Sequence, residues 1–400
     1  MTTAIPHDTT PLFTALAAAD EDRIVFDLTG IETGYERLRR ELPDVSVRFA
    51  MKACPVDEVL ACLVRKGAGI DAAGPREMRQ ALRAGAAVGS MHYGNTVKSD
   101  RNIAEAHRLG VRDFATDSLE DVAAIARHAP GARVFCRIAT SGEGALWGLG
   151  RKFGCPPAHA VRVLESARDS GLTPSGLSVH VGSQQMTADA WSAAIDTLAD
   201  VLTTLRRRGT HLDHINLGGG LPALGYLDKH GRPLDPPLEK IFAVIRDGIR
   251  YLRRVHGGRL AFLMEPGRHL VADHGAVRAH AVRLTRRPGH DGEDRRWLYL
   301  SCGRFNGLYE TDALQYRLVF PTHPHARYVS ATVAGPTCDS DDAHSPDHAP
   351  VRVPENLASG DPVWVLSCGA YTTSYTTRGF NGFAPLPYEC TGGTDSETAR

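Results

Sequence analysis

Residues 69–95 read GIDAAGPREMRQALRAGAAVGSMHYGN, and this stretch determines the fold class. It opens with the short apolar segment GIDAAG (69–74) and closes with another, SMHYGN (90–95). Between them, PREMRQALRAG (75–85) carries apolar residues at every third or fourth position, which is the spacing of an amphipathic helix. A strand, a helix and a second strand in immediate succession predict two parallel strands joined by a crossover helix.

The same alternation occurs eight times along the chain. The segments that we predict as strands are VRFAMK (47–52), GIDAAG (69–74), SMHYGN (90–95), DFATDS (113–118), RVFCRI (133–138), LSVHVGS (177–183), HINLGGG (214–220) and AFLMEPG (261–267). Alanine-rich amphipathic stretches such as SLEDVAAIARHA (118–129) lie between them. Eight strand–helix units are the pattern of a parallel (β/α)8 barrel of the TIM type, and we assign residues 30–270 to it.

The alternation of strands and helices ends after residue 271. Val-, Leu- and Tyr-rich runs without long helices follow, separated by polar turns. We therefore predict a C-terminal antiparallel β domain over residues 1–29 and 271–390, with the early segment RIVFDL (23–28) returning to pair with it. The final residues, 391–400, are polar, and we predict that they are disordered.

The composition excludes several classes of function. Lysine plus arginine equals aspartate plus glutamate, 46 of each, so no basic field exists to attract nucleic acid or an anionic membrane. No apolar run approaches the roughly 18 residues that span a bilayer, and the N-terminus lacks the pattern of a signal peptide. The eight cysteines include no CxxC pair, which favours reduced thiols in the cytoplasm over disulfides or a zinc site. We expect no metal, no nucleic acid and no membrane partner.

Polar or glycine residues lie near the carboxyl end of each predicted strand, where barrel active sites are built. They are Lys52, Asp71, Asn95, Asp117, Arg137, His180, Gly218 to Gly220, and Glu265. Helix capping explains some of them, and Asp117 followed by Ser118 has the pattern of a cap. Capping does not explain a lysine, an arginine, a histidine and a glutamate on one rim. The sequence therefore predicts an active site at this end of the barrel.

With these segments in place, the chain resembles the ornithine/diaminopimelate/arginine decarboxylase family of fold type III enzymes, and within it the bacterial ornithine decarboxylases. The resemblance runs from about Ile24 to Pro385. Its motifs, in family order, are FAMKAC, GIDAAGPREM, YGNTVK, RKFGC, SVHVGSQQ, INLGGGLP, EPGRHLVA, AGPTCDS, and GAYTTSY followed by FNGF. It implies an alanine-racemase-like architecture, pyridoxal 5'-phosphate (PLP) as cofactor, and decarboxylation of an amino acid.

The chemistry of decarboxylation requires several of these residue types. The reaction leaves a carbanion at Cα, which PLP stabilises as an electron sink. A lysine must form the Schiff base, and Lys52 stands at the end of the first barrel strand. A carboxylate beside the ring nitrogen keeps it protonated, and the resemblance gives that role to Glu265 and phosphate binding to Arg268. It places further cofactor contacts on Asp71, Glu77, Arg137, His180, Ser183, Gly220, Gly267 and Tyr371.

Most of these residues also have a purely structural interpretation. Glu265 and Arg268 could form a surface ion pair, and the glycine run could be an ordinary tight turn. His180 could be a buried, hydrogen-bonded strand residue, and Glu77 a favourable charge in the first turn of a helix. Asp71 is expected to orient groups rather than to react.

After carbon dioxide leaves, Cα must be protonated, and the resemblance implies that Cys338 in GPTCDS does this from the other subunit. The working unit is then a homodimer with shared active sites. Free cysteines are often small buried hydrophobes, but the polar run TCDSDD argues against that here. The resemblance also gives Asp339 contact with the distal amine of the substrate. Tyr309 and Glu310 fall in FNGLYETDALQY (305–316), which resembles the short helix that lines the substrate pocket.

The residues after Cys338 favour a diamine-forming enzyme. They read Asp339–Ser340, where diaminopimelate enzymes resemble CES, and Asp339 with Glu310 can face a distal ammonium. L-Ornithine, converted to putrescine in polyamine biosynthesis, is the leading expectation. Segment 305–316 is one residue shorter than in the bacterial relatives, and the loop 339–355 lacks their aromatic–acidic stretch. Lysine, diaminobutyrate, or a hydroxylated or pathway-specific diamino acid therefore stays open.

Three other functions share parts of this pattern. A PLP racemase needs a second acid/base opposite the lysine and pairs the ring nitrogen with arginine, which Glu265 and the Cys338 motif oppose. A non-catalytic relative tends to lose the lysine, the cysteine or the phosphate contacts, and all are present. A barrel enzyme without PLP would leave Lys52, Arg268 and Tyr371 as coincidences.

Overall fold

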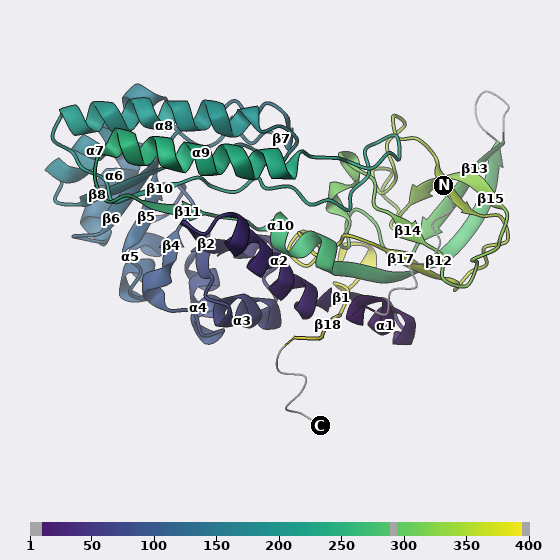
Figure 1. The fold of residues 1–400 in the computed structure, drawn as a ribbon. Coiled ribbons are helices and arrows are strands. Elements are labelled where there is room, and N and C mark those ends of the chain that lie inside the picture. Colours follow the sequence, from purple (N-terminus) through teal and green to yellow (C-terminus); the bar gives the residue numbers. More distant parts are fainter. Residues whose placement is uncertain (1–9, 289–293, 394–400) are drawn as a thin grey trace. The chain divides into compact units, whose positions relative to one another are not determined.

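The computed structural model describes residues 10–288 and 294–393 (Figure 1). The chain forms two compact units. The first, here called the barrel unit, contains residues 33–222 and 236–269. The second, the β unit, contains the described parts of residues 1–32, 223–235 and 270–400, so residues 223–235 leave the predicted barrel range and pack with the β unit.

Eight strands close the barrel unit into a ring in which every neighbouring pair is parallel. They are β2 (Val45–Ala50), β3 (Gly69–Ala72), β4 (Met91–Tyr93), β5 (Asp113–Thr116), β6 (Arg133–Arg137), β8 (Thr173–Ser178), β10 (His214–Asn216) and β11 (Ala261–Met264). Each overlaps one of the eight predicted segments, which confirms the parallel barrel, although β8 begins four residues before its predicted segment 177–183. Strands β3 and β4 are buried along their whole length, as expected for a parallel sheet covered by helices.

The strands of the barrel are connected by amphipathic helices. They are α3 (Asp57–Arg65), α4 (Pro75–Arg83), α5 (Asp100–Arg108), α6 (Leu119–His128), α7 (Pro157–Asp169), α8 (Asp189–Arg207) and α9 (Leu238–His256). Helix α2 (Leu28–Glu41) precedes the first barrel strand, and short helical turns are η1 (Met51–Ala53), η2 (Val88–Ser90) and α10 (Arg268–Val271). Ser118 caps α6 by accepting a hydrogen bond from the Asp121 amide, as its sequence position predicts. Figure 1 shows α8 and α9 packed side by side. Strand β7 (Ala145–Trp147) follows β6 along the chain, β9 (Ser183–Gln185) follows β8, and the two pair as a small antiparallel sheet.

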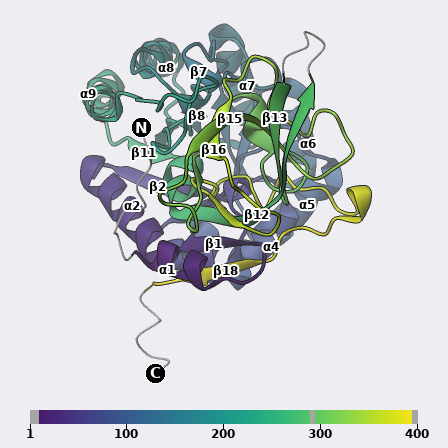
Figure 2. The ribbon, with the colours of Figure 1, turned by 90° about the vertical axis from the view of Figure 1, so that its right-hand side faces the viewer.

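The β unit is built on one mixed sheet. Its strands are β1 (Arg23–Asp27), β12 (Gly275–Pro288), β13 (Asp294–Leu300), β14 (Leu318–Val319), β15 (Tyr328–Ala334), β16 (Val351–Pro354), β17 (Pro362–Val365) and β18 (Tyr388–Thr391), with helical turns α1 (Pro11–Ala18), η3 (Ala272–His274), η4 (Tyr309–Asp312) and η5 (Phe380–Gly382). The predicted β domain is confirmed, and β1 returns to it by pairing with β12 and β18. Figure 2 shows β1 beside β18 and α1.

Two pairs of this sheet, β1–β18 and β13–β15, are parallel, so the sheet is mixed rather than purely antiparallel. A parallel pair requires a long connection, which residues 301–327 provide between β13 and β15. Strand β16 lies within the polar loop 339–355, and Thr391 ends β18. Residues 394–400 of the predicted disordered tail lie outside the described residues.

Among the described residues of the β unit, apolar side chains pack in one core around Leu298 and Val353 and in another around Leu16 and Trp364. All eight cysteines are free: six are buried, Cys390 is half-buried and Cys338 is exposed. Among the helices of the described chain, none combines the length and the apolar character that a membrane crossing requires.

Candidate active site

Lys52 stands in the turn η1, directly after β2, and its side chain is 51% exposed. The neighbouring strand β3 carries Asp71, whose Oδ2 lies 3.9 Å from the Lys52 Nζ. Burial alone would raise the pKa of Asp71, but the hydrogen bond from His92 and the charge of Lys52 outweigh it and lower the pKa to about 2. Asp71 is therefore a buried carboxylate that faces the predicted cofactor lysine.

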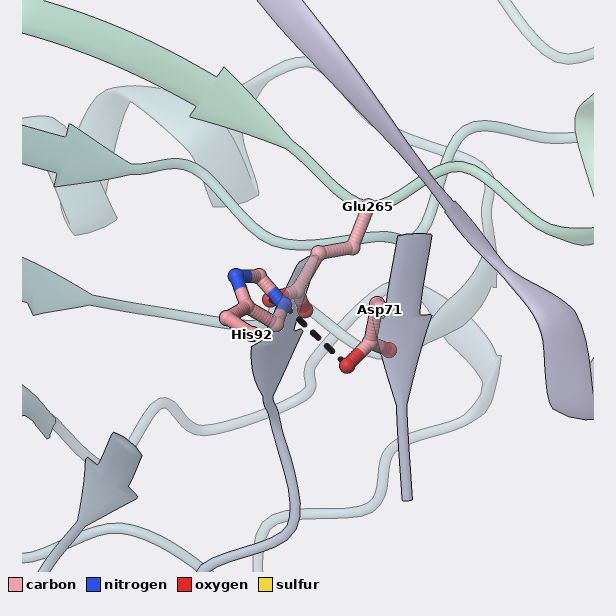
Figure 3. Close-up of side chains that lie close together, drawn as sticks. All are labelled: Asp71, His92 and Glu265. Carbon is pink, nitrogen blue, oxygen red and sulfur yellow. Dashed lines mark hydrogen bonds and ion pairs between the residues drawn. The ribbon is translucent and has the colours of Figure 1, made fainter. Parts of the chain in front are cut away.

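A second carboxylate, Glu265, follows the end of β11 and joins the same cluster (Figure 3). His92 on β4 places its Nε2 2.9 Å from Glu265 Oε1 and 3.1 Å from Asp71 Oδ1. Asn216, at the end of β10, donates from Nδ2 to Glu265 Oε1 at 2.5 Å and accepts a hydrogen bond from the Gly218 amide. Residues on or directly after the strands β3, β4, β10 and β11 thus form one hydrogen-bonded network.

Arg137 and His180 are two further predicted site residues, one charged and one neutral. Burial lowers the pKa of the Arg137 guanidinium on β6, but the charges of Glu265, Asp117 and Asp71 oppose that effect. Burial, reinforced by the charges of Arg137 and Lys52, lowers the pKa of His180 to about 3. His180 is therefore neutral near pH 7, and its Nδ1 accepts a hydrogen bond from the Gly182 amide. A neutral imidazole of this kind can stack against an aromatic ring without adding charge.

Ser183 and Arg268 meet at the start of β9 and α10. The Arg268 Nε and Nη2 atoms lie 3.3 and 3.2 Å from the Ser183 hydroxyl oxygen, and its guanidinium lies 4.5 Å from the centre of the Trp147 ring. Gly220 has a φ of +107°, and a Cβ there would lie 2.5 Å from the Gly182 carbonyl oxygen. A guanidinium, a hydroxyl and a backbone without side chains are the donor set that binds a phosphate group.

Glu77 and Gly267 shape the backbone of the site. The Glu77 carboxylate in the first turn of α4 accepts a hydrogen bond from the Ala73 amide at 2.6 Å, which is the geometry of a helix-entry cap. Burial raises its pKa. A Cβ at Gly267 would lie 2.8 Å from the Cβ of Ala53, so the glycine lets this segment approach the turn that carries Lys52.

The remaining predicted residues belong to the β unit. Cys338 is exposed, and the side chain of Asn381 makes two contacts with it. The Asn381 Oδ1 accepts a hydrogen bond from the Cys338 amide at 2.8 Å, and its Nδ2 lies 3.2 Å from the Cys338 sulfur. Asp342 accepts hydrogen bonds from the Arg304 and Thr337 amides and from the Thr337 hydroxyl. These contacts fix the polar loop around the cysteine.

Glu310 in η4 is buried, whereas the neighbouring Tyr309 is exposed. The ring of Tyr309 packs edge-on against Tyr375 at 5.0 Å, and Tyr375 stacks on Tyr371 at 5.1 Å. Tyr371 has a φ of +64°, which is rare for a bulky residue and marks a constrained turn. The carboxylate of Asp339 accepts a hydrogen bond from the Asp341 amide and begins a tight turn.

The sequence did not single out His92, Asn216, Asn381 or Asp342. His92 and Asn216 each sit in a short strand among apolar neighbours, where a polar residue inside a closed barrel is itself a signal. Asn381 stood in the FNGF motif without an assigned role, and Asp342 was one of several acidic residues in its loop.

The barrel unit fits PLP by its donor set. Lys52 can bind an aldehyde covalently, Glu265 offers a carboxylate that can accept from a ring nitrogen, and the Ser183–Arg268 pair with Gly220 offers donors for a phosphate. Gly220 cannot be replaced without moving this backbone, because a Cβ there would lie 2.5 Å from the Gly182 carbonyl oxygen.

Comparison with known proteins agrees with this chemistry. Residues 28–272 match the family described as pyridoxal-dependent decarboxylase, pyridoxal binding domain. The lysine/ornithine decarboxylase of Selenomonas ruminantium is 31% identical over 370 residues, which cover 91% of this chain and 88% of that protein. A structure of lysine decarboxylase from the same organism aligns over 98% of both chains with a TM-score of 0.83 and 27% identity. A structure of SrLDC with PLP and cadaverine covers 97% of this chain and 95% of its own, with a TM-score of 0.82 and 28% identity. The chain therefore belongs to the pyridoxal-dependent decarboxylases and is a PLP-dependent amino-acid decarboxylase.

Proposed function

We propose that this enzyme decarboxylates a small basic L-amino acid and that L-ornithine, giving putrescine, is its preferred substrate. The observation that carries the proposal is the pair of carboxylates in the β unit: Asp339 directly follows the exposed Cys338, and Glu310 is buried in η4. A distal ammonium group is matched by carboxylates of this kind. The relative named lysine/ornithine decarboxylase supports the same substrate class.

In the proposed reaction, bound PLP supplies the electron sink for the electron pair that carbon dioxide leaves at Cα. Lys52 would hold the cofactor through its Nζ, next to the ionised Asp71. Glu265 would hold the proton of the ring nitrogen, and Ser183 with Arg268 would bind the phosphate. The neutral His180 would pack against the ring and exclude water from one face.

The substrate is tested by offering the purified enzyme ornithine, lysine, arginine, diaminobutyrate and diaminopimelate and measuring the products by mass spectrometry. We expect putrescine to form with the highest kcat/KM. A higher kcat/KM with another member would keep the decarboxylase chemistry but refute the ornithine assignment. No turnover of any member, with PLP bound through Lys52, would count against a free basic amino acid as substrate.

L-Lysine is the second candidate, because solved structures similar to this chain are named lysine decarboxylases and one holds cadaverine. The segment 305–316 decides between the two substrates in this proposal, since it contains Tyr309 and Glu310. An insertion or deletion of one residue in the 3-10 turn η4 would rotate the side chains after it by about 120°.

We propose that Cys338 delivers the proton to Cα, and that Asn381 holds the thiol in place. Cys338→Ala is expected to keep PLP bound but to lower kcat by about a hundredfold, the scale of a lost general acid, and to give product protonated at the wrong carbon. Product analysis by mass spectrometry, with cofactor content from absorbance, measures both effects. Cys390→Ala is the control, because Cys390 is a half-buried free cysteine of the same β unit. Parental behaviour of Cys338→Ala would refute the assignment of the acid.

We propose further that the enzyme is a homodimer in which Cys338 and Asp339 complete the partner's site. If so, co-folding Lys52→Ala with Cys338→Ala subunits restores one intact site in each mixed dimer. The expected activity of an equal mixture is about a quarter of the parent activity, measured as correctly protonated product. Activity no higher than that of the separate variants, in a mixture shown to contain mixed dimers, would contradict shared sites.

The same proposal places the enzyme in the cytoplasm and in polyamine metabolism. Eight free cysteines, six of them buried, suit a reducing compartment. The pathway depends on the substrate, so product identity in the panel above also tests it.

A further inference from the structure

One buried histidine of the barrel unit lies between the two carboxylates of the site and has no assigned role. His92 on β4 is 0% exposed, and its Nε2 is within hydrogen-bond distance of both Glu265 Oε1, at 2.9 Å, and Asp71 Oδ1, at 3.1 Å (Figure 3). Ionised carboxylates accept hydrogen bonds but cannot donate them. The Nε2 atom must therefore carry a proton, which both carboxylates share.

No second contact holds this imidazole by its other nitrogen. Within the described parts of the chain, the Nδ1 of His92 is buried without a hydrogen-bond partner. Its ring packs against Phe135 at 5.2 Å between centres. The polar interactions of His92 are therefore directed entirely at Asp71 and Glu265, unlike those of a histidine that ties two parts of a backbone together.

The hydrogen bonds that described residues donate to the Glu265 carboxylate fall on one of its two oxygens. His92 and Asn216 both contact Oε1, and Asn216 is itself fixed by the Gly218 amide. Two donors on one oxygen fix the rotation of the carboxylate group. Oε2 then remains as the oxygen that can accept a hydrogen bond from a cofactor.

The proton on His92 also affects the charges of the site. The contacting atoms of Asp71, His92 and Glu265 all lie within 4.8 Å of one another. Two ionised carboxylates this close repel each other, and without a hydrogen-bond donor between them one tends to take up a proton. Burial and the charge of Arg48 act to lower the pKa of His92, but the two carboxylates outweigh them and raise it.

We propose that His92 is a positioning residue for decarboxylation: the proton on its Nε2 keeps Asp71 and Glu265 ionised side by side and fixes Glu265 so that Oε2 faces the ring nitrogen of PLP. This inference rests on the proposed role of Glu265. It assigns to His92 no contact with substrate and no chemical step. Its effect is on the charge and orientation of the group that holds the ring-nitrogen proton.

The test compares His92→Leu, which removes the shared proton, with His92→Gln, whose amide can still donate to both carboxylates. We expect His92→Leu to weaken PLP binding by about ten- to a hundredfold, the ratio that corresponds to one lost hydrogen bond to a charged group. Its kcat should fall with little change in KM, and the visible absorption spectrum of bound PLP should shift. His92→Gln should recover most of the affinity and the parental spectrum.

His214→Leu is the matched control. His214 is a second buried histidine of the barrel unit, it packs on the same Phe135 ring at 5.5 Å, and its Nε2 has no hydrogen-bond partner in the described chain. A loss of packing should affect both leucine variants in thermal unfolding. Only His92→Leu should change the PLP spectrum.

Three results would overturn the inference. They are equal effects of His92→Leu and His214→Leu on PLP binding and spectrum, failure of a folded His92→Gln to recover either property, and a stoichiometric divalent metal that His92→Leu loses. The PLP readouts need no substrate, so they stay valid if ornithine is the wrong substrate. If Glu265→Gln leaves the PLP spectrum unchanged, the proposed role of Glu265 fails instead, and the inference on His92 falls with it.

Discussion

Lys52→Ala is expected to abolish turnover. We assign the covalent attachment of PLP to the Nζ of Lys52, which lies 3.9 Å from a carboxylate held ionised by His92. Removing a covalent catalytic group lowers kcat by roughly a thousandfold or more. Release of carbon dioxide from labelled substrate measures the loss, and mass spectrometry of the reduced protein shows whether PLP is still attached.

Lys240→Ala is the control for this variant, because Lys240 is an exposed lysine on α9 of the barrel unit. It should retain parental turnover and covalent PLP. If Lys52→Ala kept PLP attached to the protein at another lysine, the assignment of the cofactor lysine would be wrong, although the family would stand.

Glu265→Gln is expected to lower kcat by about a hundredfold or more while KM changes little. The amide keeps the shape of the side chain and can still accept from Asn216 and His92, but it has no negative charge to hold the ring-nitrogen proton. A loss of this size is typical when one preorganised electrostatic partner is removed from an active site. Steady-state kinetics and the absorption spectrum of bound PLP measure the effect.

Glu239→Gln provides the matched control, since Glu239 is an exposed glutamate on α9 that pairs with Arg37 on the surface. It should behave as the parent enzyme. A Glu265→Gln variant with near-parental kcat would contradict the role given to Glu265, even with PLP bound.

The barrel could be predicted from the sequence because each of its units is local. An apolar strand followed by an amphipathic helix is visible within one stretch such as residues 69–95, and parallel strands align their carboxyl ends without further information. That alignment brought Lys52, Asp71 and Glu265 into one network. The pairing of β1 with β18 could not be predicted in this way, because strand partners at opposite ends of a chain leave no local pattern.

The same distinction applies to the site. Lys52 and Arg268 stand in motifs that chemistry makes conspicuous, whereas His92 looks like a packing residue between Met91 and Tyr93. The role proposed for His92 depends on its contact with Glu265, which follows the last barrel strand. It depends also on the absence of a hydrogen-bond partner at Nδ1 among the described residues. Sequence spacing carries no information about such a contact. The link between Asn381 and Cys338 was hidden for the same reason.

The parallel pairing of β1 with β18 determines what a proteolytic cut before β18 would expose. Strand β18 covers one side of β1, while β12 covers the other. A protease cut before Tyr388 would do more than shorten the chain, because it would uncover the backbone amides and carbonyls of β1 as a free sheet edge. Such an edge is a template for adding a strand from another molecule. Loss of the last described strand would therefore promote aggregation while leaving every residue of the barrel rim in place.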